Sequence, residues 1–228
     1  MKIIVIVSAN AEWRVVKELY PDLDIQRSPF GEYADLTFPT LNVKRVTLFH
    51  GGWGKISAAA TAQYVIDHFQ PDLLVNLGTC GGFAGRIQTG TVMLVERTLV
   101  YDIIEQMGDG AEAIEHYATD IDLSWLDDGS KTAHRPSVMR GLLVSADRDI
   151  VVEDIPMLIE KYGAVAADWE SGAIAWVAKQ NGTRLLILRA VSDVVGGEGG
   201  EAYGNLELFH QRTRVVMKDL FDQLPEWI

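Results

Sequence analysis

Short apolar runs alternate with segments of helical spacing along the chain. The apolar runs are rich in Ile, Val and Leu and contain few polar positions, which is typical of strands that are covered on both faces. The predicted strands are Lys2–Ser8, Tyr33–Phe38, Val43–His50, Leu73–Leu77, Thr91–Val95, Gly141–Ser145, Ala164–Ala167 and Arg184–Val191. Because helices between strands form the crossover connections of parallel strands, this alternation predicts an α/β fold.

Apolar residues recur every three or four positions in several segments between or after these strands. The pattern is clearest in Ile56–Phe69, and Pro71 ends that segment. Such spacing predicts an amphipathic helix that stops before the proline. The other predicted helices are Ala11–Tyr20, Glu170–Lys179 and Leu206–Leu224.

The 228 residues are enough for one large domain or two small ones. The chain contains no internal repeat and no low-complexity stretch, so we predict one domain over residues 1–228. The segment Tyr101–Pro136 lacks clear periodicity. We interpret it as a long irregular excursion that carries function or an interface rather than as a linker.

Charge and cysteine content narrow the possible partners. The chain has 20 basic and 32 acidic residues and therefore a formal net charge of −12. A protein that binds nucleic acid needs a positively charged surface, so this charge argues against nucleic-acid binding. Its single cysteine, Cys80, cannot form an internal disulfide. Ile3–Val7 is too short for the apolar part of a signal peptide, and no apolar run approaches the roughly 20 residues that span a bilayer. We predict a cytoplasmic protein without a nucleic-acid or membrane partner.

Small, glycine-rich and acidic segments follow most of the predicted strands. In open α/β sheets, ligands bind beyond the carboxyl ends of the strands. The segments are Ser8–Glu12, Gly51–Lys55, Gly78–Gly82, Ser145–Asp147, Asp168–Glu170 and Val191–Asp193. Three of their carboxylates, Glu12, Glu170 and Asp193, are candidates for proton transfer or substrate binding. From the residues alone they could equally be first-turn acids or caps of helices.

Several familiar motifs are absent. Gly54-Lys55 resembles the end of a phosphate-binding loop, but Phe49 replaces the first glycine of that loop and Ile56 replaces its Ser or Thr. No dinucleotide fingerprint follows the first strand, and the sequence contains no G-x-S-x-G motif. The five histidines lack metal-ligand spacing. We therefore predict no cofactor and no metal.

Four segments in order resemble the nucleoside phosphorylase/nucleosidase superfamily, and most closely its methylthioadenosine/S-adenosylhomocysteine nucleosidase branch. They are Gly54–Ala59, Asn76–Gly82, Arg140–Asp147 and Arg189–Val194. The resemblance extends from Met1 to about Leu224 and fails only in the excursion. It implies a central twisted, mixed sheet flanked by helices, and a homodimer whose active site borrows from the partner. It also implies hydrolysis of a purine nucleoside to free base and sugar without metal or cofactor.

The resemblance assigns roles to the three carboxylates. Asp193 matches the acid that protonates N7 of the purine, Glu12 matches the base that activates water, and Glu170 matches the carboxylate that holds the ribose hydroxyls. The other predicted substrate contacts are Ala9, Trp53, Thr79, Cys80, Gly81, Asp149, Ile150, Asp168, Trp169, Ser192 and Tyr203. We interpret Cys80 as a buried small hydrophobe and Lys55 as structural rather than catalytic.

The sequence favours water over phosphate as the nucleophile. Phosphorylases of this superfamily hold phosphate with a Gly-x-Pro-x-x-Arg loop after the first strand, and here that loop has neither Gly nor Pro. Glu12 would also repel a phosphate dianion. Arg14 is a weak counter-signal, and Arg86 lies far along the glycine-rich segment. A phosphorylase and a non-catalytic nucleoside sensor remain alternatives.

The identity of the substrate is less determined. The family's adenine pocket usually has an aromatic residue where this chain has Asp149, directly before Ile150. Trp53, Trp169 and the Thr79-Cys80 pair also depart from the usual residues. A nucleoside of the methylthioadenosine/S-adenosylhomocysteine type is the first prediction, and another purine nucleoside such as futalosine is the alternative.

Overall fold

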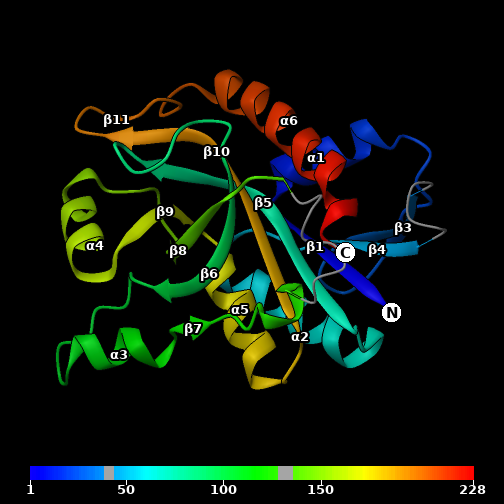
Figure 1. Ribbon diagram of the computed structural model, residues 1–228, viewed down its shortest axis with the longest axis horizontal. Coiled ribbons are helices and arrows are strands. Elements are labelled where there is room, and N and C mark those ends of the chain that lie inside the picture. The colour runs from blue at the N-terminus through cyan, green and yellow to red at the C-terminus, as the bar shows by residue number, and fades with distance from the viewer. Residues whose placement is uncertain (39–43, 128–135) are drawn as a thin grey trace.

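A mixed sheet forms the centre of the molecule, and helices cover both of its faces (Figure 1). The computed structural model describes residues 1–38, 44–127 and 136–228. The eleven strands of the described chain are β1 (Ile3–Ser8), β2 (Gln26–Arg27), β3 (Glu32–Phe38), β4 (Lys44–His50), β5 (Leu73–Phe83), β6 (Val92–Val100), β7 (Thr119–Asp120), β8 (Met139–Ser145), β9 (Ala164–Asp168), β10 (Leu185–Gly196) and β11 (Gly199–Gly200). The α-helices of the same residues are α1 (Asn10–Leu19), α2 (Gly54–Phe69), α3 (Gly110–His116), α4 (Ile155–Tyr162), α5 (Ser171–Gln180) and α6 (Leu206–Gln223).

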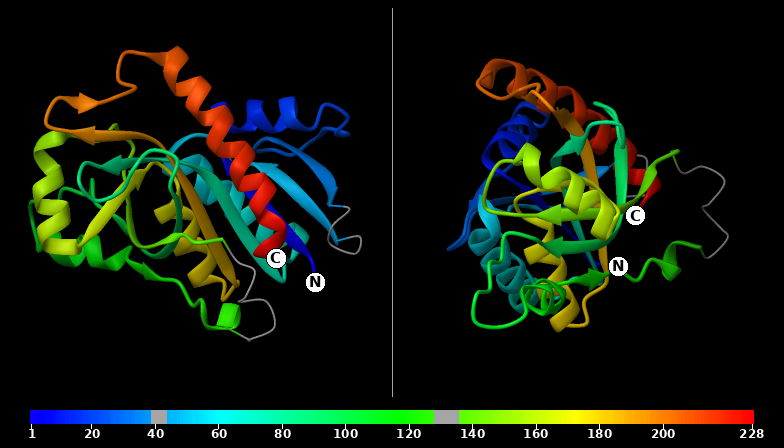
Figure 2. Two further views of the ribbon diagram at one scale, coloured as in Figure 1. Left: turned by 45° about the horizontal axis from the view of Figure 1, so that its top comes forward. Right: turned by 90° about the vertical axis from the view of Figure 1, so that its left-hand side faces the viewer.

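Alternation along β1 divides the core into two layers. Ile3, Val5 and Val7 pack in one cluster with residues of α1 and α6. Ile4 and Ile6 pack in another cluster with residues of α2 and α5. Because successive side chains of a strand point to opposite faces, a strand that is apolar at every position needs helices on both sides. Figure 2 shows these helices in two further orientations.

Five strands close into a ring. β5 pairs with β10 and β9, β10 pairs with β6, and β8 joins β6 to β9. The register of β10 against β5 shifts between Val191 and Asp193, so Ser192 is an extra residue opposite the Cys80–Gly81 step. Such a bulge redirects the side chains that follow it. The bulge therefore determines how Asp193 is presented at this end of the ring.

The predicted fold class is confirmed, but several predicted ends are wrong. The glycine-rich segment Gly78–Gly82 is part of β5 rather than a loop after it, and β10 continues past Val191 to Gly196. Pairing between the two strand extensions supplies the backbone hydrogen bonds that the sequence pattern does not reveal. The helix predicted to begin at Glu170 begins at Ser171.

The described part of the excursion is more regular than expected. It contains α3, β7 and a 3-10 turn at Ser124–Asp127. Residues 128–135 of the excursion and Val43, the first residue of a predicted strand, lie outside the described residues. No helix in the described ranges is long and apolar enough to cross a membrane.

Candidate active site

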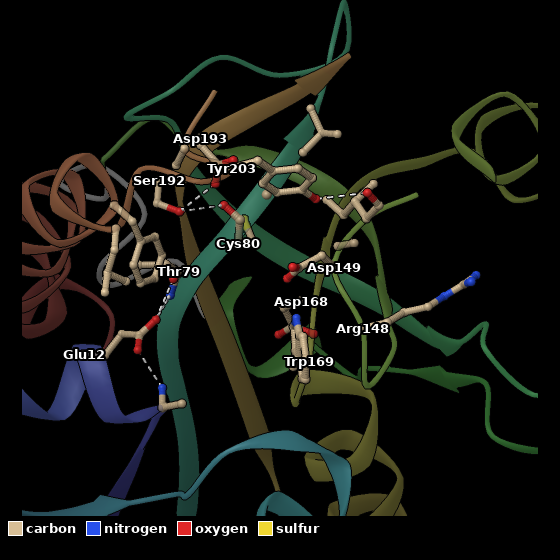
Figure 3. Close-up of a pocket in the computed structure, with 18 of the residues that line it drawn as sticks. Glu12, Thr79, Cys80, Arg148, Asp149, Asp168, Trp169, Ser192, Asp193 and Tyr203 are labelled. Atoms are coloured by element: carbon tan, nitrogen blue, oxygen red, sulfur yellow. Dashed lines mark hydrogen bonds between the residues drawn. The ribbon is translucent and has the colours of Figure 1, made fainter. Parts of the chain in front are cut away.

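A cavity of about 680 Å³ lies where the carboxyl ends of several strands meet (Figure 3). This volume is within the range of small-molecule sites in proteins. All fourteen residues predicted from the sequence line it: Ala9, Glu12, Trp53, Thr79, Cys80, Gly81, Asp149, Ile150, Asp168, Trp169, Glu170, Ser192, Asp193 and Tyr203. The structure thus brings together residues from seven separate stretches of the chain, while their roles stay a prediction.

Eight further lining residues were not predicted. They are Arg148, Ala167, Val195, Ala202, Gly204, Asn205, Leu206 and Phe209. Most are sequence neighbours of predicted residues, and that adjacency was the signal that could have found them. Leu206 and Phe209 lie on the first turn of α6, and nothing in the sequence marked them as ligand contacts. Apolar residues at helical spacing normally indicate core packing.

Glu12 is buried in the first turn of α1 and both of its carboxylate oxygens are held. Oε2 accepts a hydrogen bond from the Ala9 backbone N–H at 2.7 Å. Oε1 accepts from the Thr79 hydroxyl at 2.5 Å and from the Thr79 backbone N–H at 3.4 Å. Glu12 therefore does support the start of its helix, and the same contacts fix the carboxylate at the wall of the cavity.

Arg189 is completely buried behind the cavity. Its guanidinium forms an ion pair with Asp168 at 2.8 Å and donates hydrogen bonds to Ser171 and Asn76, each at 2.8 Å. Gly78 leaves room for the guanidinium, because a Cβ at Gly78 would lie 1.9 Å from Nη1. Sequence reasoning did not identify Arg189 or Asn76 as supports of the site, although both lie in the segments that carry the family resemblance.

Glu170 shares this buried environment. Its Oε1 accepts a hydrogen bond from the Gly54 backbone N–H at 3.1 Å, and its Oε2 lies 4.0 Å from Arg189. Burial raises the pKa of Glu170 to about 8; the charge of Asp168 also raises it, and Arg189 lowers it. Asp168 accepts hydrogen bonds from the Ser145 hydroxyl at 2.5 Å and the Ser171 N–H. One guanidinium thus faces two carboxylates.

Asp193 lies at the other end of the cavity from Glu12 (Figure 3). It is 7% exposed, and burial raises its pKa, while hydrogen bonds from Ser192 and the Ala202 backbone and the charge of Arg212 oppose the rise. The Ser192 hydroxyl donates to Oδ1 at 3.2 Å. A carboxyl group in this environment retains its proton at a higher pH than an exposed aspartate does.

Aromatic side chains border the cavity. The Trp53 and Trp169 rings lie 5.3 Å apart between centroids, and Trp53 is 63% exposed. The Tyr203 hydroxyl donates a hydrogen bond to the Ile150 carbonyl at 3.0 Å. These rings provide flat apolar surfaces beside a polar interior, an arrangement that suits a heterocyclic ligand.

The cavity has an excess of negative charge. Five carboxylates line it: Glu12, Asp149, Asp168, Glu170 and Asp193. Among the described residues, Arg148 is the only Lys or Arg in the lining, and its guanidinium pairs with Asp154 and lies 5.3 Å from the Tyr101 ring. Arg14 and Arg86 are not part of the lining. An anionic ligand would therefore meet no free cation of the described chain here.

Cys80 has the character predicted for it. Its side chain is buried, and burial raises the pKa of the thiol far above its ordinary value. A thiol that stays protonated is a poor nucleophile. Within residues 1–38, 44–127 and 136–228, no three His, Cys, Asp or Glu side chains are grouped as metal ligands.

An α/β sheet with a carboxylate-lined cavity at the carboxyl ends of its strands is typical of a protein that binds a small polar molecule. The model of the phosphorylase superfamily matches residues 2–224, and the chain belongs to this family. The resemblance predicted from the sequence is thereby confirmed.

Known relatives agree with this placement. The 5'-methylthioadenosine/S-adenosylhomocysteine nucleosidase of Anoxybacillus flavithermus is 27% identical over 195 residues, which cover 79% of this chain and 80% of the relative. That of Maridesulfovibrio salexigens is 29% identical over 188 residues, 76% and 78% of the two chains. The fold is that of the S-adenosylhomocysteine nucleosidase of Streptococcus pyogenes in complex with 5-methylthiotubericidin, with a TM-score of 0.76, 20% identity and coverage of 100% and 95% of the two chains.

We expect replacement of Glu170 with glutamine to change how stability depends on pH. The pKa of Glu170 rises from about 4.5 in the unfolded chain to about 8 in the folded protein, so the folded state binds this proton more tightly. The resulting stability is fully present below pH 4.5 and is lost as the pH rises to about 8. Glu170→Gln stays neutral, and its free energy of unfolding should fall less than that of the wild type over this range.

Urea unfolding at a series of pH values between 4.5 and 9 measures this difference. Glu160→Gln, on the exposed side of α4, is the matched control and should follow the wild-type curve. Parallel curves for Glu170→Gln and the wild type would contradict the raised pKa.

Proposed function

We propose that the protein hydrolyses the N-glycosidic bond of a purine nucleoside and releases free base and sugar. The observation that carries this proposal is the position of Glu12, Glu170 and Asp193 around one cavity. The curated relatives, which are named as nucleosidases, support it. The first substrate we propose is a nucleoside of the methylthioadenosine/S-adenosylhomocysteine type, as in the names of those relatives.

In the proposed reaction, Asp193 serves the leaving base. The bond between the anomeric carbon and N9 breaks, its electron pair moves into the purine, and Asp193 gives a proton to N7. This requires a carboxyl group that is protonated near neutral pH, and the raised pKa of Asp193 favours that state. The sugar is left with positive charge in the transition state.

Glu12 and Glu170 serve the sugar. Glu12 takes a proton from the water that attacks the anomeric carbon, and its contacts with Ala9 and Thr79 keep the carboxylate in place. Glu170 accepts hydrogen bonds from the ribose hydroxyls. These donors favour its ionised form, which the buried surroundings oppose in the free protein. The negative charge also stabilises the cationic sugar.

Water is the proposed nucleophile rather than phosphate. A phosphate dianion beside Glu12 would be repelled, and binding it would require arginine or lysine side chains. In the described lining, the one arginine, Arg148, is paired with Asp154, and Figure 3 shows it directed away from Glu12. This charge distribution supports a hydrolase over a phosphorylase.

We expect Glu12→Gln and Asp193→Asn each to reduce the rate of base release by more than about 100-fold, because each removes a proton-transfer group. Free purine measured by chromatography gives the rates, with methylthioadenosine as substrate. Addition of phosphate should leave the wild-type rate unchanged and should produce no sugar phosphate.

Glu160→Gln is the matched control and should retain wild-type activity, because Glu160 is exposed on α4 and is not part of the cavity lining. Near-normal rates in both active-site variants would refute the assigned roles. A strict requirement for phosphate would instead identify a phosphorylase.

One observation favours a second substrate class. Asp149 lines the cavity, and no hydrogen bond or ion pair joins its carboxylate to another described residue. A carboxylate accepts hydrogen bonds but donates none, and the neighbouring Ile150 carbonyl is already bonded to Tyr203. Hypoxanthine presents an N1–H donor where adenine has an acceptor. A 6-oxopurine nucleoside such as futalosine is therefore the second candidate.

A panel of methylthioadenosine, S-adenosylhomocysteine, adenosine, inosine and futalosine distinguishes the two candidates. The fastest release from methylthioadenosine or S-adenosylhomocysteine supports the first, and the fastest release from inosine or futalosine supports the second. If Asp149 selects the base, Asp149→Asn should shift the preference toward adenine by about tenfold or more, because an amide can both donate to N1 and accept from the 6-amino group. Thermal stabilisation by these nucleosides without any release would instead indicate a sensor.

We further propose that the protein is a cytoplasmic homodimer whose partner subunit completes the cavity. Apolar side chains are exposed beside the cavity on Trp53, at 63%, and on the neighbouring Ile56, at 84%. Ile104 and Met107, at 81% and 97%, lie on the segment that Asp102 joins to Lys55 of α2. Clustered exposed apolar side chains are typical of an interaction surface.

Light scattering should give a mass of about twice the 25.2 kDa of the chain. Ile56→Asp should shift the protein toward the monomer and lower its activity, because a charge would be buried at the interface. Val215→Asp, at a position on α6 that is 59% exposed, is the control and should leave the mass unchanged. A wild-type protein that remains monomeric at assay concentration would contradict the proposal.

A further inference from the structure

Three loops at the carboxyl ends of the strands are joined by one lysine and two aspartates. The Lys55 ammonium group pairs with both oxygens of Asp102 and lies 3.5 Å from Asp147 Oδ2. The Lys55 backbone N–H donates to Asp147 Oδ1 at 2.8 Å, and the Asp147 N–H donates to Asp102 Oδ2 at 2.9 Å. These contacts connect the start of α2 with the segments that follow β6 and β8. We refer to Lys55, Asp102 and Asp147 as the rim cluster.

The rim cluster is adjacent to the backbone group that holds Glu170. Gly54, directly before Lys55, donates its N–H to Glu170 Oε1 at 3.1 Å. Gly54 has φ +80°, and a Cβ there would lie 2.9 Å from Asp147 Oδ1. Only glycine combines this backbone conformation with so close an approach. The position of the Gly54 N–H is therefore coupled to the position of Asp147.

Glu170 has two competing partners. The Gly54 N–H holds Oε1, while the Arg189 guanidinium lies 4.0 Å from Oε2. Without the Gly54 N–H, the Glu170 carboxyl group would be left with the Arg189 guanidinium, 4.0 Å away, as its hydrogen-bond donor, and the side chain would turn toward it. The contact with Gly54 thus decides which way the carboxylate points.

We propose that the rim cluster positions Glu170 for recognition of the ribose hydroxyls, with Lys55 as its central residue. The proposal rests on the proposed function, in which Glu170 accepts those hydrogen bonds. The side chains of Lys55 and Asp102 are 21% and 18% exposed. Removing the lysine charge would leave the partly buried Asp102 carboxylate in repulsion with that of Asp147, whose side chain is 40% exposed. The loops would then separate, and the Gly54 N–H would move away from Glu170. The cluster is a positioning device and contacts no reacting atom.

The test compares a ribonucleoside with its 3′-deoxy analogue as substrates. In the wild type, loss of the hydroxyl should lower kcat/KM by about 10- to 100-fold, the range for a hydrogen bond to a charged group. Lys55→Met should reduce this discrimination by about tenfold, mainly through the ribonucleoside, because a displaced Glu170 no longer distinguishes the two substrates. Glu170→Ala should show the same loss, and the double variant should show no further loss.

Two further variants keep the test decisive if Lys55→Met is unstable. Asp102→Asn removes one charge of the cluster and should reduce the discrimination partially, while Lys55→Arg keeps the charge and should restore most of it. Lys218→Met removes the lysine of an exposed ion pair with Asp222 on α6 and is the matched control, with wild-type discrimination expected. Circular dichroism confirms that each variant is folded.

The possible outcomes separate the two proposals. If the rim cluster serves stability alone, Lys55→Met and Asp102→Asn will lower kcat/KM for both substrates equally, and the unchanged ratio will overturn the inference. If the wild type releases no base from any nucleoside, the proposed function itself fails. Loss of discrimination in Lys55→Met and Asp102→Asn, with retention in Lys218→Met, supports the positioning role.

Discussion

The arrangement of the cavity depends on one buried guanidinium. Arg189 has no access to solvent, and a buried charge is tolerated only when it is paired and hydrogen-bonded. Its partners come from β5, β9 and α5 through Asn76, Asp168 and Ser171. Arg189 can make all of these contacts only when β5, β9 and α5 lie in one arrangement relative to each other. Arg189 therefore fixes the positions of the strand ends that form the cavity.

The surroundings give the three central carboxylates different properties. Burial raises the pKa of Glu170, and the charge of Asp168, which takes the close ion pair with Arg189, raises it further. Burial raises the pKa of Asp193, and the charge of Arg212 opposes this rise only in part. Glu12 is held by the Ala9 backbone N–H and the Thr79 hydroxyl. In the reaction that we propose, the acid, Asp193, and the base, Glu12, therefore lie at opposite ends of one cavity, as cleavage of a glycosidic bond with two carboxyl groups requires.

The charge of the lining also makes this cavity unsuited to an anionic ligand. The lining carries five carboxylates, and the arginine that the described chain contributes is engaged by Asp154. Outside the cavity, attraction between opposite charges joins the loops that carry the rim cluster. The ammonium group of Lys55 lies between Asp102 and Asp147, so one cation keeps two like charges together. Opposite charges thus connect loops that are distant in the sequence.

The sequence by itself determined most of the elements and all fourteen predicted residues that line the cavity. Apolar runs and helical spacing are local patterns, so they identify β1 or α2 without knowledge of the rest of the chain. The family resemblance of the ordered segments predicted that Glu12, Glu170 and Asp193 share one site, and all three line the cavity.

Only the tertiary structure decided the strand ends, the bulge at Ser192, the Arg189 network and the rim cluster. Each of these depends on pairing between segments far apart in the chain, such as Val191 opposite Cys80 or Lys55 beside Asp102. A local pattern records which residues are apolar or charged but not which distant partner they meet. The register of β10 against β5 and the order of the strands supply that information, because they set where each side chain lies in space.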